Sequence, residues 1–309
     1  MNRMNTLFSW LLLIMNIFPT GWKIDEQSSN KIKGNEYNLS VPDKIYSLPA
    51  TLYEVSGITE IDESTIACVQ DENGIVFIYD LNKNETVRTI FFGSEGDYED
   101  IVRVNNTLYI LRSDEVLAEI INFNDKNFKR TVYPVNIPGK DCEGLCYDKK
   151  NNRLLFAPKE ISDDNPDNKG KRFIYGFDLK TKALIKGPVL RFDINEIEKF
   201  AIENNIKIPM KGKKGEKEKP DINLRISALG IHPVTNRIYV ISGPERMFYV
   251  FDMNGKIQYL QKLDNKLFPQ PEGIVFMKNG DMLISNEGKK DLATIVRFNY
   301  KSKTGSQPL

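Results

Sequence analysis

The sequence has very little cysteine and histidine, the residue types that most often build metal and catalytic sites. Of its 309 residues only three are Cys and one is His. Because three is an odd number, the cysteines cannot all pair in disulfides. Cys142 and Cys146 lie four residues apart in a segment expected to be extended, which puts their Cα atoms about 13 Å apart, too far to bridge. We expect Cys68, Cys142 and Cys146 to be small buried residues, and neither a zinc site nor a His232-based mechanism is favoured.

An excess of charge of either sign is also absent. The chain has 43 Lys and Arg against 42 Asp and Glu, a net charge of +1. This balance excludes a global attraction to nucleic acid. The sequence contains no phosphate-binding P-loop, no dinucleotide-binding glycine motif and no EF-hand loop. Hydrophobic residues make up 40% of the chain and charged residues 28%, as in a globular protein with a substantial core.

Long hydrophobic runs are missing except for one short run at the start. Residues 7–18 are mostly apolar, follow Arg3 and end before Pro19. About 20 residues are needed to span a bilayer as a helix, so this run fits the charged and apolar regions of an export signal. We therefore expect residues 1–22 to direct export, to the periplasm or the cell membrane. No clear cleavage site follows, so a short uncleaved anchor and membrane association through it remain open.

A repeat is the strongest pattern in the chain. A short motif with Gly or Asp at its centre recurs at intervals of 43, 44, 86 and 43 residues, in Ser56-Gly57-Ile58, Glu99-Asp100-Ile101, Glu143-Gly144-Leu145, Leu229-Gly230-Ile231 and Glu272-Gly273-Ile274. In the first unit, apolar or alternating segments cover residues 57–61, 66–69, 74–80 and 86–92, with turn clusters between them. Four short strands in each repeat are typical of a β-propeller blade.

The fold predicted by this repeat is an all-β propeller of four-stranded antiparallel blades over residues 45–300. Five repeats are visible, and the doubled interval leaves a sixth open. Residues 23–44 are expected to form a linker. The overlapping segment 37–48 would add an outer strand to the last blade and so close the ring. Residues 301–309 read as a tail.

One insertion, residues 193–222, differs from the repeats. Within residues 193–205, Ile194, Ile197 and Ala201 share a helical face behind a capping Asp193, which predicts a short helix. Residues 211–219 are rich in Lys and are expected to form a solvated loop. Partner docking or contact with an anionic membrane is the alternative, although interspersed Glu residues dilute the charge.

Propeller geometry converts the repeat into a site. The start of the first strand and the end of the second strand of each blade lie on the same face. Three repeat motifs place carboxylates there, Glu99, Glu143 and Glu272. The ends of second strands add further polar groups, namely Asp71, Arg112, Lys159, Asn286 and Glu287.

These groups have two natural uses. Ca²⁺ binds six to eight oxygens in irregular geometry, so the carboxylates of Asp71, Glu99, Glu143, Glu272 and Glu287 are the candidate metal ligands. Arg112, Lys159 and Asn286 are the candidates for binding a small polar or anionic ligand. The alternative is that these residues only form buried ion pairs that close the channel mouth. If they are not paired, several carboxylates crowded on one rim should show raised pKa values.

Several motifs in a fixed order over residues 45–300 carry a family resemblance. They are Gly96-Asp97-Tyr98-Glu99-Asp100-Ile101, Cys142-Glu143-Gly144-Leu145, Ile231-His232-Pro233, and above all Leu267-Phe-Pro-Gln-Pro-Glu-Gly-Ile274 followed by Ser285-Asn-Glu-Gly-Lys289. Together they resemble the SdiA-regulated family of bacterial extracytoplasmic β-propeller proteins. The resemblance implies an exported or membrane-associated propeller, similar in architecture to phytase-like propellers, in a family connected with calcium. Asp100 stands where the family has Gly and is expected to add a carboxylate near the rim.

Two functions follow as hypotheses. The first is a non-enzymatic sensor or interaction module that binds Ca²⁺ or a small polar ligand at the channel mouth, with an extracytoplasmic protein as an alternative partner. The second is a Ca²⁺-dependent hydrolase of phosphoesters or lactones, in which the carboxylates hold the cation and Arg112 or Lys159 stabilises the developing charge. A purely structural scaffold is a third reading.

Overall fold

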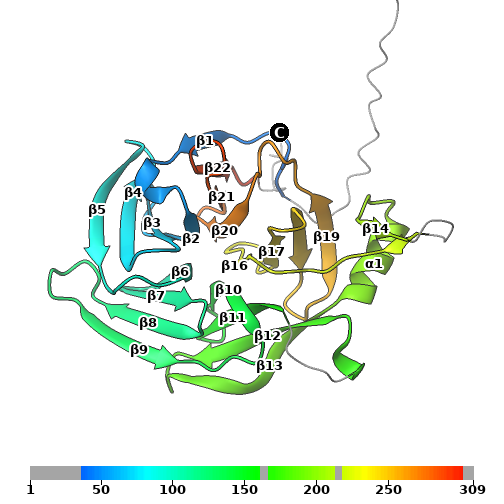
Figure 1. The fold of residues 1–309 in the computed structure, drawn as a ribbon, viewed down its shortest axis with the longest axis horizontal. Coiled ribbons are helices and arrows are strands. Elements are labelled where there is room, and N and C mark those ends of the chain that lie inside the picture. Colours follow the sequence, from blue (N-terminus) through cyan, green and yellow to red (C-terminus); the bar gives the residue numbers. More distant parts are fainter. Residues whose placement is uncertain (1–35, 161–165, 213–217, 302–309) are drawn as a thin grey trace, which may run out of the picture. The chain divides into compact units, whose positions relative to one another are not determined.

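Five four-stranded antiparallel sheets stand around a common centre in the computed structural model, which describes residues 36–160, 166–212 and 218–301 (Figure 1). Each sheet is one blade. In four of the blades the strands follow one another along the chain from the centre outward, whereas the fifth blade takes its outermost strand from the start of the described chain. The predicted five-bladed propeller is therefore confirmed. The part of the chain that the structure describes holds no sixth blade, because the doubled interval contains the insertion instead.

The blades divide the strands as follows. Blade 1 holds β2 (Val55–Glu60), β3 (Thr65–Gln70), β4 (Ile75–Asp80) and β5 (Glu85–Phe91). Blade 2 holds β6 (Tyr98–Val104), β7 (Thr107–Arg112), β8 (Val116–Ile121) and β9 (Lys129–Pro134). Blade 3 holds β10 (Lys140–Asp148), β11 (Arg153–Glu160), β12 (Lys171–Asp178) and β13 (Ala183–Asp193). Blade 4 holds β16 (Ala228–Ile231), β17 (Ile238–Ser242), β18 (Met247–Phe251) and β19 (Ile257–Lys262). Blade 5 holds β20 (Pro271–Phe276), β21 (Met282–Asn286), β22 (Thr294–Phe298) and β1 (Lys44–Ser47). Two 3-10 turns, η1 (Ala50–Leu52) and η2 (Pro166–Asn168), precede β2 and β12.

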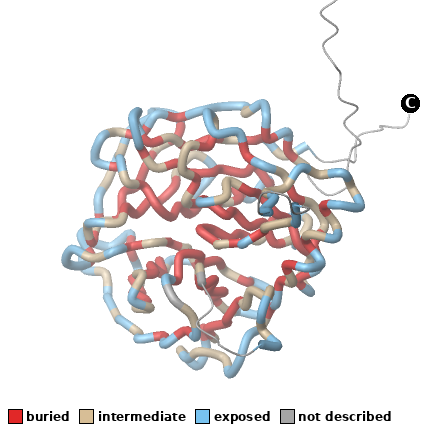
Figure 2. The backbone as a smooth tube through the Cα atoms, turned by 45° about the vertical axis from the view of Figure 1, so that its right-hand side comes forward, coloured by how far each residue is buried: buried red, intermediate tan, exposed pale blue. Residues whose placement is uncertain are grey.

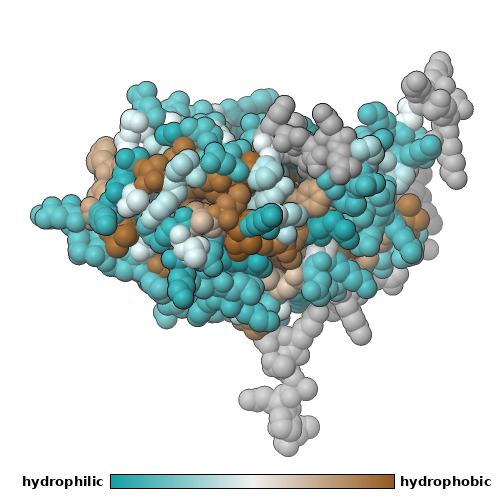
Figure 3. Space-filling model, turned by 90° about the horizontal axis from the view of Figure 1, so that it is seen from below, coloured by the Kyte–Doolittle hydropathy of each residue, from teal (hydrophilic) through white to brown (hydrophobic). Residues whose placement is uncertain are grey.

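The innermost strands form a closed ring. β2 contacts β6, β6 contacts β10, β10 contacts β16, β16 contacts β20, and β20 returns to β2 (Figure 1). Burial follows this order, since the inner strands are almost entirely buried or half-buried whereas an outer strand such as β5 alternates with solvent (Figure 2). Viewed from the side of β9 and β13, the outer surface is largely hydrophilic with an apolar area near its middle (Figure 3).

The core is divided among the spaces between neighbouring blades. Five apolar clusters occupy the described part of the chain, and each combines side chains from two adjacent blades. The cluster between blades 5 and 1 includes Tyr46 and Leu48, which flank the end of β1. β1 itself pairs antiparallel with β22, with Tyr46 opposite Ile295. The segment expected to close the ring thus supplies the outer strand of the last blade.

The insertion contains the predicted helix. α1 spans Ile194–Glu203, and the Asp193 side chain caps it by accepting a 2.9 Å hydrogen bond from the backbone N–H of Asn195. Its buried face carries the expected Ile194, Ile197 and Ala201. A two-stranded ribbon follows, formed by β14 (Met210–Lys211) and β15 (Lys219–Pro220). Among the described residues, no helix has the length and apolar character that crossing a bilayer requires. Residues 1–22, expected to direct export, lie outside the described part of the chain.

Candidate functional site

A β-bulge at the start of the inner strands builds the candidate site. In β6, Tyr98 pairs with Arg112 and Asp100 with Leu111, so Glu99 is the extra residue. The same one-residue shift leaves Glu143 unpaired in β10 and Glu272 unpaired in β20. A bulge bends the strand locally and redirects the unpaired side chain. The three predicted carboxylates therefore occupy equivalent positions at one mouth of the channel.

The carboxylates of Glu99, Glu143 and Glu272 interact electrostatically. Burial, followed by the charges of Glu143 and Asp97, raises the pKa of Glu99 to about 9. Burial and the charge of Glu143 likewise raise the pKa of Glu272 to about 8. Among the described residues one cation lies near them, Lys159, which forms an ion pair with Glu143. A single positive charge does not balance this group, so part of it holds protons near neutral pH.

A second carboxylate group stands beside the first and is arranged like a metal site. Oxygens of Glu54, Asp71 and Glu287 all lie within 4.8 Å of one another. All three residues are half-buried. Burial, followed by the charge of Glu54, raises the pKa of Asp71 to about 6. Burial and the charge of Asp71 raise the pKa of Glu287 to about 7. We call Glu54, Asp71 and Glu287 the acidic triad.

The two groups form one continuous acidic mouth. The charge of Glu287 contributes to the raised pKa of Glu272, and the charge of Asp97 contributes to the raised pKa values of both Asp71 and Glu99. The five predicted metal ligands are thus at the same mouth, but only Asp71 and Glu287 belong to the acidic triad.

Some buried oxygens at the acidic mouth have no hydrogen-bond partner in the described part of the chain. Among the described residues, Asp71 Oδ1 and Asn286 Oδ1 are buried acceptors with no hydrogen-bond partner. Asn286 is fully buried, and its Nδ2 donates to the Leu267 carbonyl and to Thr294 Oγ1, at 3.4 and 3.2 Å. A buried acceptor left unpaired costs free energy, which a bound cation would recover.

The two cationic side chains predicted to bind a ligand, Arg112 and Lys159, each form an ion pair with a carboxylate. The Arg112 guanidinium donates from Nε and Nη2 to the two carboxylate oxygens of Asp114, each at 2.7 Å. This bidentate pair fixes Arg112 at the rim. Lys159 is held by Glu143 as described above. Neither cation is in place to attract an anion unless its carboxylate partner is displaced.

Asp100 is not a rim ligand, which corrects the expectation from the sequence. Its side chain is buried and accepts hydrogen bonds from the backbone N–H groups of Ile101 and Leu145, at 2.8 and 2.7 Å. The second bond joins blade 2 to blade 3. Burial nevertheless raises the pKa of this carboxyl well above its usual range. Asp100 is therefore a structural link between inner strands.

Histidine and cysteine take no part in the site. His232 Nδ1 accepts hydrogen bonds from the backbone N–H groups of Val234 and Thr235, and burial lowers the pKa of the imidazole to about 4. The ring is packed among aromatic side chains, including Phe276 and Tyr300 with centroids 4.9 and 4.8 Å away. All three cysteines are buried and free, as expected.

Sequence reasoning missed one member of the acidic triad. Glu54 lies in the turn between η1 and β2, two residues ahead of Ser56 in the first repeat motif. Ser56 occupies the position that Glu99, Glu143 and Glu272 hold in other blades. The signal was an acidic residue just before the one blade head in which the motif itself begins with Ser.

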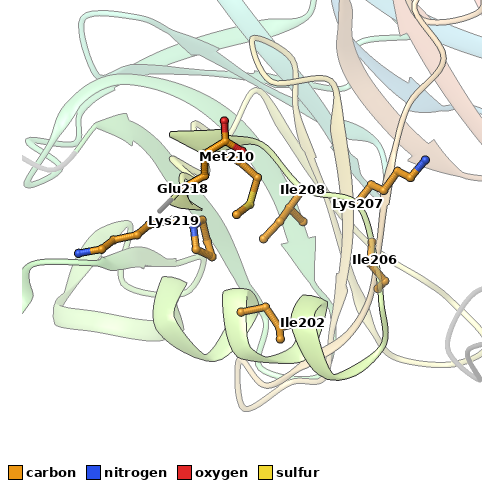
Figure 4. A pocket seen from close by; sticks show the side chains of 8 residues that line it. Ile202, Ile206, Lys207, Ile208, Met210, Glu218 and Lys219 are labelled. Carbon is orange, nitrogen blue, oxygen red and sulfur yellow. The ribbon is translucent and has the colours of Figure 1, made fainter. Parts of the chain in front are cut away.

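A separate apolar pocket lies on the insertion, away from the acidic mouth. It has a volume of about 690 Å³ between α1 and the β14–β15 ribbon (Figure 4). Ile202, Ile208 and Met210 line it, together with Lys207 and Lys219. Its walls carry few groups suited to chemistry, so it is not part of the candidate site.

Comparison with known proteins bears on the fold. The structure of glutaminyl cyclase from Myxococcus xanthus is similar with a TM-score of 0.54 and 15% identity, covering 85% of this chain and 97% of that one. The chain is a β-propeller. A structure of streptogramin B lyase matches this propeller with a TM-score of 0.44 and 14% identity, over 83% of this chain and 97% of the other. No protein-family model matches the propeller sequence, and no curated protein does. At 15% identity the similarity to glutaminyl cyclase establishes the fold alone.

Proposed function

We propose that the acidic mouth of the propeller binds a divalent cation, Ca²⁺ in preference to Mg²⁺, and that the protein is a non-enzymatic binding module. The observation that carries this proposal is the acidic triad, whose oxygens lie within 4.8 Å of one another next to buried, unpartnered oxygens. Assignment to the SdiA-regulated family and an extracytoplasmic location belong to the same proposal and rest on the motifs and on residues 1–22.

The spacing of the acidic triad suits Ca²⁺. Ca²⁺–oxygen distances of about 2.3–2.6 Å put two ligands on opposite sides of the ion roughly 4.6–5.2 Å apart. Oxygens within 4.8 Å of one another can therefore surround Ca²⁺ with little movement. Three carboxylates offer up to about six oxygens, and Ca²⁺ accepts six to eight, so positions remain for water or for a polar group of a small ligand.

Charge supports the same conclusion. Without a cation, the pKa values of Asp71 and Glu287, raised to about 6 and 7, mean that these two carboxyls hold protons at a higher pH than ordinary carboxyls do. A divalent cation removes the repulsion between the carboxylates and replaces the bound protons. The triad is therefore a place where cation and proton compete.

The hydrolase alternative has weaker support. It requires a cationic side chain to stabilise charge that develops on the substrate, and Arg112 and Lys159 are both paired with carboxylates. The similarity to glutaminyl cyclase transfers no activity, because unrelated functions share this fold. We therefore place binding ahead of catalysis.

Thermal unfolding with and without metal tests the proposal. Millimolar Ca²⁺ should raise the Tm of the metal-free protein by several degrees, because a site at 100 times its Kd adds about 2.7 kcal/mol and each kcal/mol moves Tm by roughly 2–4 °C at this size. Mg²⁺ should give a smaller rise. Glu287→Gln should abolish the Ca²⁺ effect. Glu63→Gln, at an exposed position outside the mouth, is the matched control and should leave it unchanged.

Two results would overturn the cation site. One is a Tm that does not respond to Ca²⁺ in the unmodified protein. The other is a Ca²⁺ response that survives Glu287→Gln undiminished, which would place the metal elsewhere.

A further inference from the structure

The opposite end of the central channel opens into a cavity of about 640 Å³. Its walls come from the final residues of all five inner strands and the turns that follow them, so it faces away from the acidic mouth. In β6, for example, Glu99 stands at the acidic mouth and Arg103 at this cavity. The volume falls within the range of about 300–1,000 Å³ that small-molecule pockets occupy.

The charged residues that line this cavity are mostly cationic. The lining includes four cationic side chains and one carboxylate, that of Glu60. The cations are Arg103, Lys149, Lys150 and Lys278. Within the described residues, none of the four cations forms an ion pair with a carboxylate. The acidic mouth is the reverse, since both of its predicted cations are neutralised by a neighbouring carboxylate.

Two of these side chains are fixed in place by the backbone. Arg103 donates from Nε to the Asn105 carbonyl, at 2.6 Å, and from Nη1 to the Ile61 carbonyl. These acceptors are neutral, so they orient the guanidinium without cancelling its charge. The Glu60 carboxylate accepts a 3.1 Å hydrogen bond from the backbone N–H of Lys278, which ties blade 1 to blade 5.

Apolar groups form much of the remaining wall. Val102, Tyr147, Ile231 and Val275 line the cavity together with the Phe276 ring. A pocket with apolar walls and a few converging charges suits a ligand that has an apolar part and an anionic end. Low-dielectric walls also focus the field of the surrounding cations.

We propose that this cavity, which we call the basic mouth, binds a small organic anion with at least two negative charges, namely a phosphate ester or a polycarboxylate with an apolar part. The inference is independent of the cation site, because it depends on residues at the other end of the channel. Arg103 and Lys278 contact the anionic groups, and Tyr147 and Phe276 contact the apolar part.

Calorimetric titration of the protein, freed of divalent cations on a chelating resin, tests this proposal. The probes are phenyl phosphate, inorganic phosphate and citrate at matched ionic strength and pH 7.5. Phenyl phosphate should bind saturably and about tenfold more tightly than inorganic phosphate, because its ring gains apolar contact. Citrate, which has no apolar part, should bind more weakly than phenyl phosphate, and a preference for citrate over both phosphates would contradict a ligand with an apolar part.

Variants locate the binding. Arg103→Gln and Lys278→Gln should each weaken the best probe at least fivefold, and Lys278→Gln serves as the second variant because its exposed side chain forms no ion pair with a described residue. Lys126→Gln is the matched control, at an exposed position in the turn after β8 that does not line the cavity. No saturable binding of any probe, or an equal loss with Lys126→Gln, would overturn the proposal.

Discussion

Individual carboxyls of the acidic mouth retain protons at a higher pH than ordinary carboxyls do. The pKa values of Asp71, Glu287, Glu272 and Glu99 are raised to about 6, 7, 8 and 9, with burial as the largest cause in each case. In the unfolded chain such carboxyls titrate near their ordinary values of about 4. The folded protein therefore binds more protons than the unfolded chain between about pH 5 and pH 9.

This difference predicts a pH dependence of stability. Because the folded state holds the extra protons, the free energy of unfolding of the metal-free protein should fall as pH rises from about 5 to 9. Chemical denaturation at pH 5.5, 7 and 8.5 measures it. With saturating Ca²⁺ the decline should become shallower, because the cation takes over the role of the protons. A metal-free protein whose stability rises with pH over this range would contradict the prediction.

The variant Glu272→Gln tests the contribution of one carboxyl to this pH dependence of stability. Glutamine resembles the protonated carboxyl and carries no charge, so at pH 8.5 without metal this variant should have a Tm several degrees above that of the unmodified protein, while at pH 5.5 the two should agree closely. The expectation follows from the pKa of Glu272, about 8. Glu63→Gln, at an exposed site, should shift neither value.

At the scale of the element, the bulge decides which side chains reach the mouth. The repeat places Glu99, Glu143 and Glu272 at intervals of 44 and 129 residues, one and three repeat lengths, so their meeting could be predicted from the sequence. The bulge itself could not, because a regular strand and a bulged strand share the same hydrophobic pattern until the partner register is known. In blade 4 the inner strand β16 pairs without a shift, and Leu229 occupies the equivalent place.

The glycines of the repeat have a steric cause in the structure. A Cβ on Gly57 would lie 2.6 Å from the Ile101 backbone nitrogen in the next inner strand, and a Cβ on Gly273 would lie 2.6 Å from the Ser56 carbonyl oxygen. Inner strands of neighbouring blades approach too closely there for any side chain. The sequence showed that these glycines recur, but their reason depends on contacts between blades.

Gly57→Ala should therefore destabilise the protein by about 2–3 kcal/mol or more, since the clash is with backbone that cannot move aside. Urea unfolding at pH 7 measures the loss. Gly93→Ala is the comparison, because a Cβ there meets first the hydroxyl of Tyr98, at 2.9 Å, the outer end of a side chain. Equal losses in the two variants would show that close approach of the strands is not the cause.

At the scale of the whole molecule, stability depends on closing the ring. Each apolar cluster needs two neighbouring blades, so the cluster between blades 5 and 1 forms only when β1 joins β22. Tyr46 is 3% exposed in this cluster, whereas Ile45, the preceding residue of β1, is 50% exposed on the other face. Because side chains alternate between the two faces of β1, Tyr46 packs in the cluster that closes the ring while the adjacent Ile45 lies at the surface.

Tyr46→Ala should cost about 3–5 kcal/mol of unfolding free energy, the range for removing a large buried aromatic side chain. Ile45→Ala should cost less than about 1 kcal/mol because its side chain is half in solvent. Thermal and urea unfolding of both variants check this pair. A comparable loss from Ile45→Ala would indicate that β1 is held by pairing alone and that the cluster contributes little.

The two mouths of the channel were not equally visible in the sequence. The acidic mouth was marked because its carboxylates sit inside the repeat motif. The cations of the basic mouth lie at strand ends and in turns, at positions without a common spacing, and Arg103, Lys149 and Lys278 read as ordinary surface charges. Only the convergence of five inner strands brings them to one cavity.

The pairing of β1 with β22 also has a consequence for the order of synthesis. β1 is made first and its partner last, with about 250 residues between them, which a ribosome adds in roughly 12–50 seconds at about 5–20 residues per second. During that time β1 has no strand to pair with, and the apolar side of blade 1 that faces blade 5 stays uncovered. The nascent chain therefore presents an aggregation-prone edge until β22 has been made. We expect that high yield requires a chaperone that shields nascent chains.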